Sequence, residues 1–317
     1  MYQTYLWKIK PISSYMTPWQ SDTIYGHFLW GIFFLYGEEE LNKIISDFEN
    51  YNSPFIISDG FLDGRLPMIK KGIIKREENK EIADSLNMNL ADVIKKRKII
   101  NKISEISLEE FNKLRGSYSN KEFVIEKLKE KEISKTSSSI QTLVMHNIIN
   151  RLSGSTVENG IFTSKEIFTD KDIWIFIKVR NDFPIEKIEK ILKFIEENGY
   201  GKKISVGKGA FKTVSFEKFD KFTKIENSNG FIVLSNYIPK PYDFSEVIYE
   251  TPLVKFGKVA NFGNNAEVPF KKTFSCFKVG SIFKNGDNKN IGKVLKNIHY
   301  DKRIVQIGIP FTLEMIV

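Results

Sequence analysis

Residues 199–209 read Gly-Tyr-Gly-Lys-Lys-Ile-Ser-Val-Gly-Lys-Gly, and they join a stretch with helical periodicity to a stretch with the alternation of a strand. The helical stretch is residues 184–198, with Pro184 in the first turn, where proline is tolerated. The strand pattern is residues 211–219. Glycines allow positive φ and close backbone approach, and lysines add compact positive charge. This glycine loop therefore suits an anion such as phosphate, held against backbone N–H groups.

The known phosphate-binding loops do not fit the glycine loop. A Walker A loop has Gly-Lys followed by Ser or Thr, but Lys208 is followed by Gly209, and the dinucleotide fingerprint has a glycine where Ile204 stands. Both of those loops run from a strand into a helix, whereas this one leaves a helix. The alternative interpretation is a helix C-cap followed by a glycine-rich hairpin, because glycine commonly ends a helix.

The remaining strong patterns complete two β-α-β units. Residues 172–180 are β-branched and aromatic throughout, which predicts a strand directly before the 184–198 helix. Residues 2–10 alternate as a strand, residues 23–36 are apolar nearly all round and predict a buried helix, and residues 55–58 predict a short strand. A second helical stretch spans residues 39–49. The order β-α-β, then β-α-β, is that of a ferredoxin-like or RNA-recognition fold.

Residues 66–138 separate the two β-α-β units and have a different composition. Charged residues dominate there, aromatic residues are rare, and residues 79–131 predict helices separated by short polar loops. The densest basic run, residues 95–98, is typical of a solvated helix face. We expect this charged insertion to stand away from the core.

The last part of the chain is rich in strand patterns. After a polar linker at residues 226–230, the sequence predicts strands, one short helix at residues 291–298 and a hairpin turn at residues 285–287. The predicted fold class is α+β with two ferredoxin-like, RNA-recognition-type domains. The first is residues 1–225, with the insertion at about 66–138, and residues 226–317 form a smaller α+β domain.

The composition narrows the class of function. The chain has 317 residues and a net charge of +9, from 48 basic and 39 acidic residues, which favours a polyanionic partner. Its one cysteine, Cys276, can form no internal disulfide, and its three histidines are scattered, so we expect neither metal nor cofactor. Without a long apolar run or a signal-peptide pattern in residues 1–10, we expect a cytoplasmic protein with no membrane partner.

Three groups of residues, in this order, resemble a known family. They are residues 21–26 (Ser-Asp-Thr-Ile-Tyr-Gly), which open the first helix, residues 147–151 (Asn-Ile-Ile-Asn-Arg) followed by Gly-Ile-Phe at 160–162, and the glycine loop. The pattern resembles the RAMP proteins of CRISPR effector complexes, and most of all the fourth Csm subunit of type III-A complexes, in the Cas-five group. The resemblance covers most of the first 220 residues. Asn150 departs from it, because an acidic residue is expected before the arginine.

The resemblance implies a function in antiviral defence. Members of this family bind the 5′ tag of the CRISPR RNA and join the large Cas-ten subunit to the backbone of Csm-three subunits. They are not credited with cleavage, which belongs to those neighbours, so no catalytic residue is implied. Of the aromatic residues, only Tyr200 is placed well enough to nominate for stacking on an unpaired base. The residues implied for RNA binding are Ser21, His27, His146, Asn147, Arg151, Gly199, Tyr200, Gly201, Lys202, Lys203, Ser205, Gly207, Lys208 and Gly209.

Two other functions stay open at this point. The first is a metal-independent CRISPR RNA processing endonuclease with His27 as general base, because some RAMP relatives use a histidine in this way. Spacing places no second acid or lysine beside His27, and such enzymes carry their glycine-rich loop near the C-terminus, so binding without cleavage is preferred. The second is a ferredoxin-like enzyme that holds a small phosphorylated substrate in the loop. Asp22 is expected to be a helix N-cap rather than a cleavage group.

Overall fold

The first sheet contains four strands in the order β2-β7-β1-β8, and all neighbouring strands are antiparallel. In chain order these are the second, third, first and fourth strands of the two β-α-β units, which is the arrangement predicted from the sequence. Their bounds are Tyr2–Pro11 (β1), Phe55–Leu62 (β2), Ile173–Arg180 (β7) and Phe211–Lys218 (β8). The computed structural model describes residues 1–72, 74–130, 139–259, 269–288 and 290–317.

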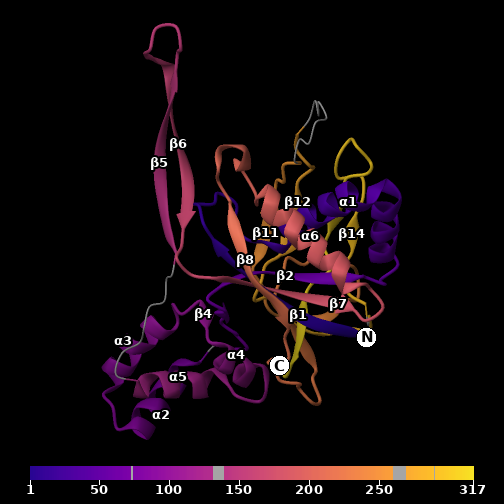
Figure 1. Cartoon of the computed structure of the whole chain (residues 1–317). Helices are drawn as coiled ribbons and strands as arrows, with labels where there is room; N and C mark the ends of the chain where they lie inside the picture. Colours follow the sequence, from indigo (N-terminus) through magenta and orange to yellow (C-terminus); the bar gives the residue numbers. More distant parts are fainter. Residues whose placement is uncertain (73, 131–138, 260–268, 289) are drawn as a thin grey trace.

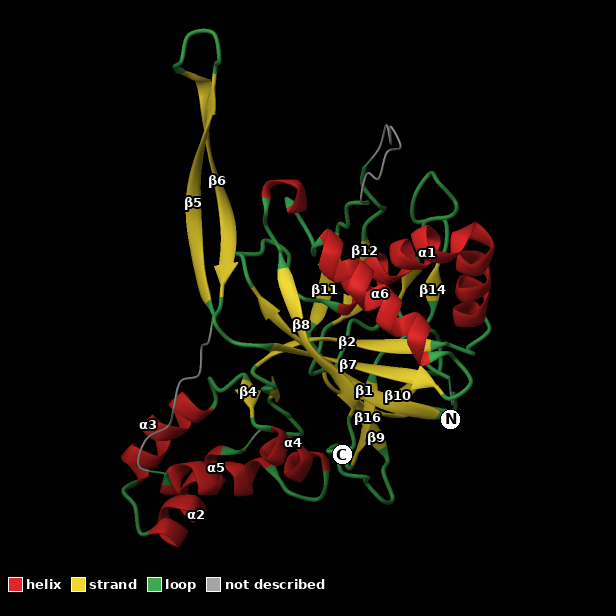
Figure 2. Cartoon of the chain, viewed as in Figure 1, coloured by secondary structure: helices red, strands yellow, loops and turns green. Residues whose placement is uncertain are grey.

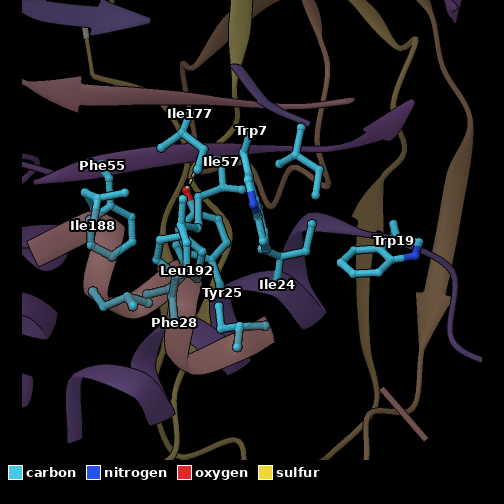
Figure 3. Packing of buried hydrophobic residues seen from close by; sticks show 14 of the residues in the cluster. Trp7, Trp19, Ile24, Tyr25, Phe28, Phe55, Ile57, Ile177, Ile188 and Leu192 are labelled. Atoms are coloured by element: carbon cyan, nitrogen blue, oxygen red, sulfur yellow. Dashed lines mark hydrogen bonds between the residues drawn. The ribbon is translucent and has the colours of Figure 1, made fainter. Parts of the chain in front are cut away.

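Two helices, α1 (Ser21–Glu49) and α6 (Ile185–Asn198), cover one face of this sheet (Figure 1). Between the helices and the sheet lies a core of large apolar side chains, in which the hydroxyl of Tyr25 accepts a hydrogen bond from the backbone N–H of Ile57 at 3.0 Å (Figure 3). The two helices predicted at 23–36 and 39–49 are joined in α1, with non-helical backbone at Gly37.

The charged insertion is helical, as predicted, but it does not stand away from the core. Its buried side chains share one hydrophobic cluster with Phe176 of β7 and Leu313 of the C-terminal part. The guanidinium of Arg115, which is buried, donates to the carbonyl oxygens of Glu314 (3.0 Å) and Thr223 (2.8 Å). The elements are β3 (Leu66–Pro67), α2 (Arg76–Leu86), α3 (Leu90–Ile100), β4 (Glu105–Ile106), α4 (Leu108–Arg115) and α5 (Asn120–Lys129).

A long two-stranded hairpin follows the insertion and projects from the body of the molecule (Figure 2). It is formed by β5 (Ile140–Ile149) and β6 (Thr156–Phe168). At its base, Ile167 exchanges two backbone hydrogen bonds with Tyr15, at 2.9 and 3.0 Å. The hairpin is therefore attached to the segment that connects β1 to α1.

The C-terminal part forms a second antiparallel sheet, in the order β10-β13-β9-β16, and two short ladders, β11-β12 and β14-β15. Its sheet strands are β9 (Gly230–Val233), β10 (Phe244–Tyr249), β13 (Ile282–Asn285) and β16 (Thr312–Met315). The ladders are formed by β11 (Pro252–Lys255), β12 (Phe274–Phe277), β14 (Val294–Leu295) and β15 (Gln306–Ile307).

The helix predicted at residues 291–298 is wrong, because β14 lies there. Ile291, Leu295 and Ile298 have helical spacing, but each packs into a local apolar cluster from extended or turn backbone. Gly292 has a φ of 86°, and a Cβ there would lie 2.7 Å from the carbonyl oxygen of Gly308. From residue 226 onward the described residues contain no α-helix, so they do not form the second ferredoxin-like unit expected from the sequence.

The two sheets face each other. Leu6, Phe61 and Phe176, on the face of the first sheet that the helices leave open, share a cluster with Ile232 and Leu313 of the second sheet. The predicted domain boundary at residues 225/226 falls between β8 and β9, and this apolar cluster continues across it. Within the described ranges, no helix is long and apolar enough to cross a membrane.

Candidate nucleic-acid interface

The glycine loop runs from the end of α6 to the start of β8 and contains one short 3₁₀ turn, η1 (Ile204–Val206). All four of its glycines have positive φ, between 70° and 81°, and Lys203 has a φ of 63°. Side chains other than glycine rarely adopt this conformation. The glycines are therefore required by the backbone path, as the sequence predicted.

The two ends of the glycine loop are fixed to each other and to the β1–α1 connection. The backbone N–H of Tyr200 donates to the carbonyl oxygen of Gly209 at 2.9 Å, and the N–H of Gly209 donates to that of Ser14 at 2.8 Å. A Cβ on residue 209 would lie 1.9 Å from the carbonyl oxygen of Tyr200. No side chain fits there, so this close approach of the two ends requires glycine at residue 209.

Tyr200 is not available to stack on a base, which corrects the sequence-based prediction. Its side chain is buried, and its ring lies parallel to that of Trp19 with centroids 3.8 Å apart. Its hydroxyl donates to the carbonyl oxygen of Pro18 at 2.8 Å, and burial raises the pKa of this phenol well above its usual value. Gly199 and Gly201, on either side of Tyr200, both have positive φ.

The tip of the glycine loop is open to solvent. Lys202, Lys203, Ser205 and Gly207 are exposed there. The N–H groups of Lys203, Ile204 and Ser205 lie at the start of the 3₁₀ turn η1. Three consecutive N–H groups beside two exposed lysines form a place where a phosphate can be held by backbone and side-chain donors together.

Lys208, by contrast, is already paired. Its Nζ donates to Glu166 Oε2 at 2.7 Å and to Ser14 Oγ at 3.1 Å, and the Ser14 hydroxyl donates to the same carboxylate oxygen at 2.6 Å. Glu166 is buried, and hydrogen bonds from Lys208 and Ser14 lower its pKa. Lys208 therefore neutralises this carboxylate, which lies on β6, and joins the glycine loop to the hairpin.

His146 lies close to the same carboxylate. Its Nε2 is 2.7 Å from Ser164 Oγ and 3.7 Å from Glu166 Oε1, and its ring stacks on Phe162 across the hairpin with centroids 5.1 Å apart. The hairpin thus brings His146 into one network with Lys208, although 62 positions separate them in the sequence numbering.

Asn147 and Arg151 lie nearer the hairpin tip and are exposed. Asn150, which departs from the family pattern, closes the turn: its Oδ1 accepts the N–H of Leu152 at 2.9 Å, and its backbone N–H donates to Ser155 at 2.8 Å. This local role accounts for an asparagine at that position, because asparagine side chains commonly form such turns.

Ser21 and His27 lie beneath the glycine loop rather than on an open surface. Ser21 is buried, and its Oγ accepts the backbone N–H of Asn236 at 2.9 Å. His27 Nε2 accepts the backbone N–H of Gly201 at 3.1 Å, and burial lowers the pKa of His27 to about 4. The ring is therefore neutral at pH 7, and the nitrogen that a general base would use is occupied by the loop.

Asp22 is not the N-cap of α1, which corrects another expectation. The N-cap is Gln20, and Asp22 Oδ1 accepts from Lys255 Nζ at 2.6 Å and from Asn236 Nδ2 at 2.8 Å. The first helical N–H, that of Ser21, donates instead to Asp59 Oδ1 at 2.8 Å. Sequence reasoning missed Asp59 because the N-terminus of a helix is usually capped by a residue next to it in the chain, whereas Asp59 lies on β2.

The sequence analysis also missed the apolar surface of the β5–β6 hairpin. Leu152 at the tip is 99% exposed, and apolar side chains are exposed along both strands. The alternation of apolar residues was visible, but alternation does not tell whether either face is covered. The exposed apolar residues are Ile140, Leu143, Met145, Ile148, Ile149, Leu152, Val157, Ile161, Phe162 and Phe168. Among the described residues, no cluster of three or more His, Cys, Asp or Glu side chains could hold a metal ion.

Comparison with known proteins gives a match in structure but not in sequence. No family model and no curated protein matches the chain. A chain of the Csm3–Csm4 subcomplex in the type III-A CRISPR-Cas interference complex matches with a TM-score of 0.61 and 19% identity, over 98% of both chains. A chain of the Csm1–Csm4 cassette in complex with cA4 matches with a TM-score of 0.60 and 13% identity, again over 98% of both. Over nearly its whole length, the protein therefore has the fold of a chain found in these Csm4-containing assemblies.

Proposed function

We propose that the protein is a non-catalytic, RNA-binding subunit of a type III-A CRISPR effector complex in antiviral defence, the counterpart of Csm4. The observation that carries this proposal is the match along nearly the full length of both chains, because Csm4 is the component that the two matched assemblies share. In this role the protein holds the 5′ tag of the CRISPR RNA and joins Csm1, the large Cas-ten subunit, to the Csm3 backbone, in the cytoplasm.

The geometry of the glycine loop supports RNA binding. Its tip offers exposed Lys202 and Lys203 beside the first N–H groups of η1, and its root is fixed by Gly209 and His27. A preformed loop loses little conformational freedom when it binds a phosphate. The net charge of +9 favours the approach of a polyanion.

The network around Glu166 supports one continuous interface. Glu166 on β6 is bonded to Lys208 of the glycine loop, so the projecting hairpin and the loop have a fixed relation to each other. Backbone phosphates positioned by the loop would therefore lie near the base of a hairpin rich in exposed apolar side chains. Such side chains can contact unstacked bases or a neighbouring subunit.

The test uses the protein produced with its neighbouring subunits and CRISPR RNA. Lys202→Glu/Lys203→Glu should lower the affinity for RNA carrying the 5′ tag by about tenfold or more, because each charge-assisted contact contributes about 1.5–3 kcal/mol. Filter binding at two salt concentrations measures this, and the loop variant should also show a weaker dependence on salt.

The matched control is Lys190→Glu/Lys193→Glu, which makes the same change of charge on the exposed side of α6. It should change RNA affinity much less. Equal affinities of the two double variants would contradict the proposal. Metal-independent, site-specific cutting of repeat RNA that disappears in His27→Ala would establish the endonuclease function instead.

A further inference from the structure

A pair of phenylalanines lies on the surface of the C-terminal part, outside the glycine loop and the hairpin. Phe256 follows β11 and Phe270 precedes β12. Their rings are stacked, with centroids 4.7 Å apart and an interplanar angle of 15°. Phe256 is 63% exposed and Phe270 is 41% exposed. Each ring leaves apolar area in water, which is unfavourable unless something covers it.

The backbone that carries the pair is fixed. Residues 252–259 and 269–277, which we name the C-terminal arm, pair through the β11–β12 ladder and continue through a bridge between Lys258 and Phe270. The N–H of Lys271 donates to Gly257 and that of Val259 donates to Pro269, both at 2.8 Å. The two rings are therefore presented by paired backbone.

The charge of the arm indicates which kind of partner covers the pair. The described part of the arm contains Lys255, Lys258, Lys271 and Lys272 and no acidic residue. Lys258 and Lys272 are exposed. Exposed aromatic rings interleaved with lysines are typical of single-stranded nucleic acid sites, where bases stack and phosphates are neutralised.

The arm is attached to the same segment as the glycine loop. Lys255 Nζ donates to Gln20 Oε1 at 2.7 Å, and the backbone N–H of Gln20 donates to the Tyr200 hydroxyl at 3.2 Å. One residue, Gln20, thus connects the arm to the root of the loop. In Figure 1, the strands β11 and β12 rise toward the same end of the molecule as the turn that precedes β8 and the β5–β6 hairpin.

We propose that Phe256 and Phe270 form a stacking site for an unpaired base of the RNA strand whose phosphates contact the glycine loop. This inference rests on the proposed function, and it adds a second contact from the C-terminal part. A base stacks on the open face of the pair, and Lys258 and Lys272 neutralise the adjacent phosphates. Because every base has a π-face, the site tolerates different bases.

The test uses the assembled complex and CRISPR RNAs in which 2-aminopurine replaces one tag nucleotide at a time. Stacking quenches this fluorescent base, so one or two positions should be dim in the wild-type complex. Phe256→Ala/Phe270→Ala should restore fluorescence at those positions and lower RNA affinity by about tenfold. Phe256→Trp, which keeps an aromatic face, should keep both properties.

The control is Val254→Ala, which removes exposed apolar area from the same arm and should change neither readout. Unchanged fluorescence and affinity in Phe256→Ala/Phe270→Ala would overturn the inference. It would also be overturned if the complex with this variant lost a neighbouring subunit but still bound RNA. If the wild-type protein itself binds no RNA, the proposed function fails as well. If the wild type and Phe256→Ala/Phe270→Ala bind equally, only the stacking site fails. Thermal melting of each variant confirms that it is folded.

Discussion

Asp59 shows how a single side chain can serve an element distant in sequence. It lies on β2, yet its carboxylate accepts the first N–H of α1, that of Ser21, 38 positions earlier in the chain. The site is buried, and burial raises the pKa of Asp59 to about 6 despite this hydrogen bond. Ionisation of the capping group is therefore less favourable in the folded protein than in the unfolded chain.

Replacing Asp59 tests this consequence through pH. A carboxyl group with a raised folded-state pKa binds its proton more tightly when folded, so the contribution of Asp59 to wild-type stability should fall as pH rises from about 4 to about 6. Asp59→Asn cannot ionise, so its free energy of unfolding relative to wild type should increase across this window, by up to about 3 kcal/mol, and stay constant above it. Urea denaturation between pH 4 and 7 measures the difference.

Asp220→Asn is the matched control, because Asp220 is exposed. Its difference from wild type should change less across the same window than that of Asp59→Asn. If the difference in free energy of unfolding between Asp59→Asn and wild type did not change with pH, the pKa of Asp59 would not be raised in the folded protein.

Single residues also show what the sequence could predict about the site. The need for glycine at 199, 201, 207 and 209 followed from residue type alone, because glycine has a conformational property that other residues lack. The burial of Tyr200 and the pairing of Lys208 could not be predicted, since they depend on Trp19 and on Glu166, which the fold brings in. The residues next to an aromatic residue or a lysine in a glycine-rich stretch do not show whether its side chain points into the core or to solvent.

At the scale of elements, Glu166 joins the hairpin to the glycine loop. This carboxylate on β6 receives hydrogen bonds from Lys208 and Ser14, beside the backbone bonds between Ile167 and Tyr15. Hydrogen bonds to an ionised group are stronger than neutral ones. The base of the hairpin should therefore be held largely by this one side chain.

Glu166→Gln keeps the shape of the side chain but removes its charge. The amides of Tyr15 and Ile167 should then exchange hydrogen about tenfold faster or more, because a charge-assisted hydrogen bond contributes about 1.5–3 kcal/mol. Hydrogen exchange read by NMR or mass spectrometry measures this. Glu158→Gln, an exposed glutamate on the same strand, is the control and should leave both amides unchanged. Similar rates in the two variants would mean that the backbone bonds alone fix the hairpin.

The elements that were predicted well are those with a strong and complete pattern. The strands at 172–180 and 211–219 and the helix at 184–198 are confirmed within one or two residues, because their apolar faces are buried as the periodicity indicates. Residues 291–298 have the same helical spacing but too short a run to outweigh the positive φ at Gly292. Hydrophobic periodicity therefore predicts a helix reliably only where no close contact between backbone segments, such as that of Gly292 with Gly308, requires another conformation.

At the scale of the whole molecule, the two sheets share one apolar cluster. Phe176 of the first sheet contacts Phe61 and Phe219, with ring centroids 5.9 and 4.9 Å away, and Phe311 of the C-terminal part, at 6.3 Å. The insertion packs into the same cluster. We therefore expect the chain to unfold in one transition, although the sequence suggested two domains.

Phe176→Ala tests this cooperativity. Removal of a fully buried phenylalanine should lower the free energy of unfolding by about 3–5 kcal/mol and destabilise both sheets together. Urea denaturation by circular dichroism, with hydrogen exchange in β7 and β9, gives the stability of each sheet. Phe34→Ala, a half-exposed phenylalanine on α1, should have a smaller effect. Two separate transitions, with only the first shifted, would contradict a shared core.

The overall arrangement was only partly predictable. The order of the first sheet follows from the two β-α-β units, because few topologies satisfy that order. The packing of the second sheet and of the insertion against it depends on which apolar faces meet, and a strand pattern alone does not say so. The charge of the insertion suggested a solvated lobe, while Phe111 and Leu114 show that its inner side is apolar.

The β5–β6 hairpin has a further consequence for the free protein. It displays a ladder of two strands whose outer edges and apolar side chains face water along most of its length. Such a surface attracts any other bare strand, including that of a second copy. The protein should therefore be most soluble when it is synthesised together with the partner that covers the β5–β6 hairpin. When it is concentrated alone, it should precipitate.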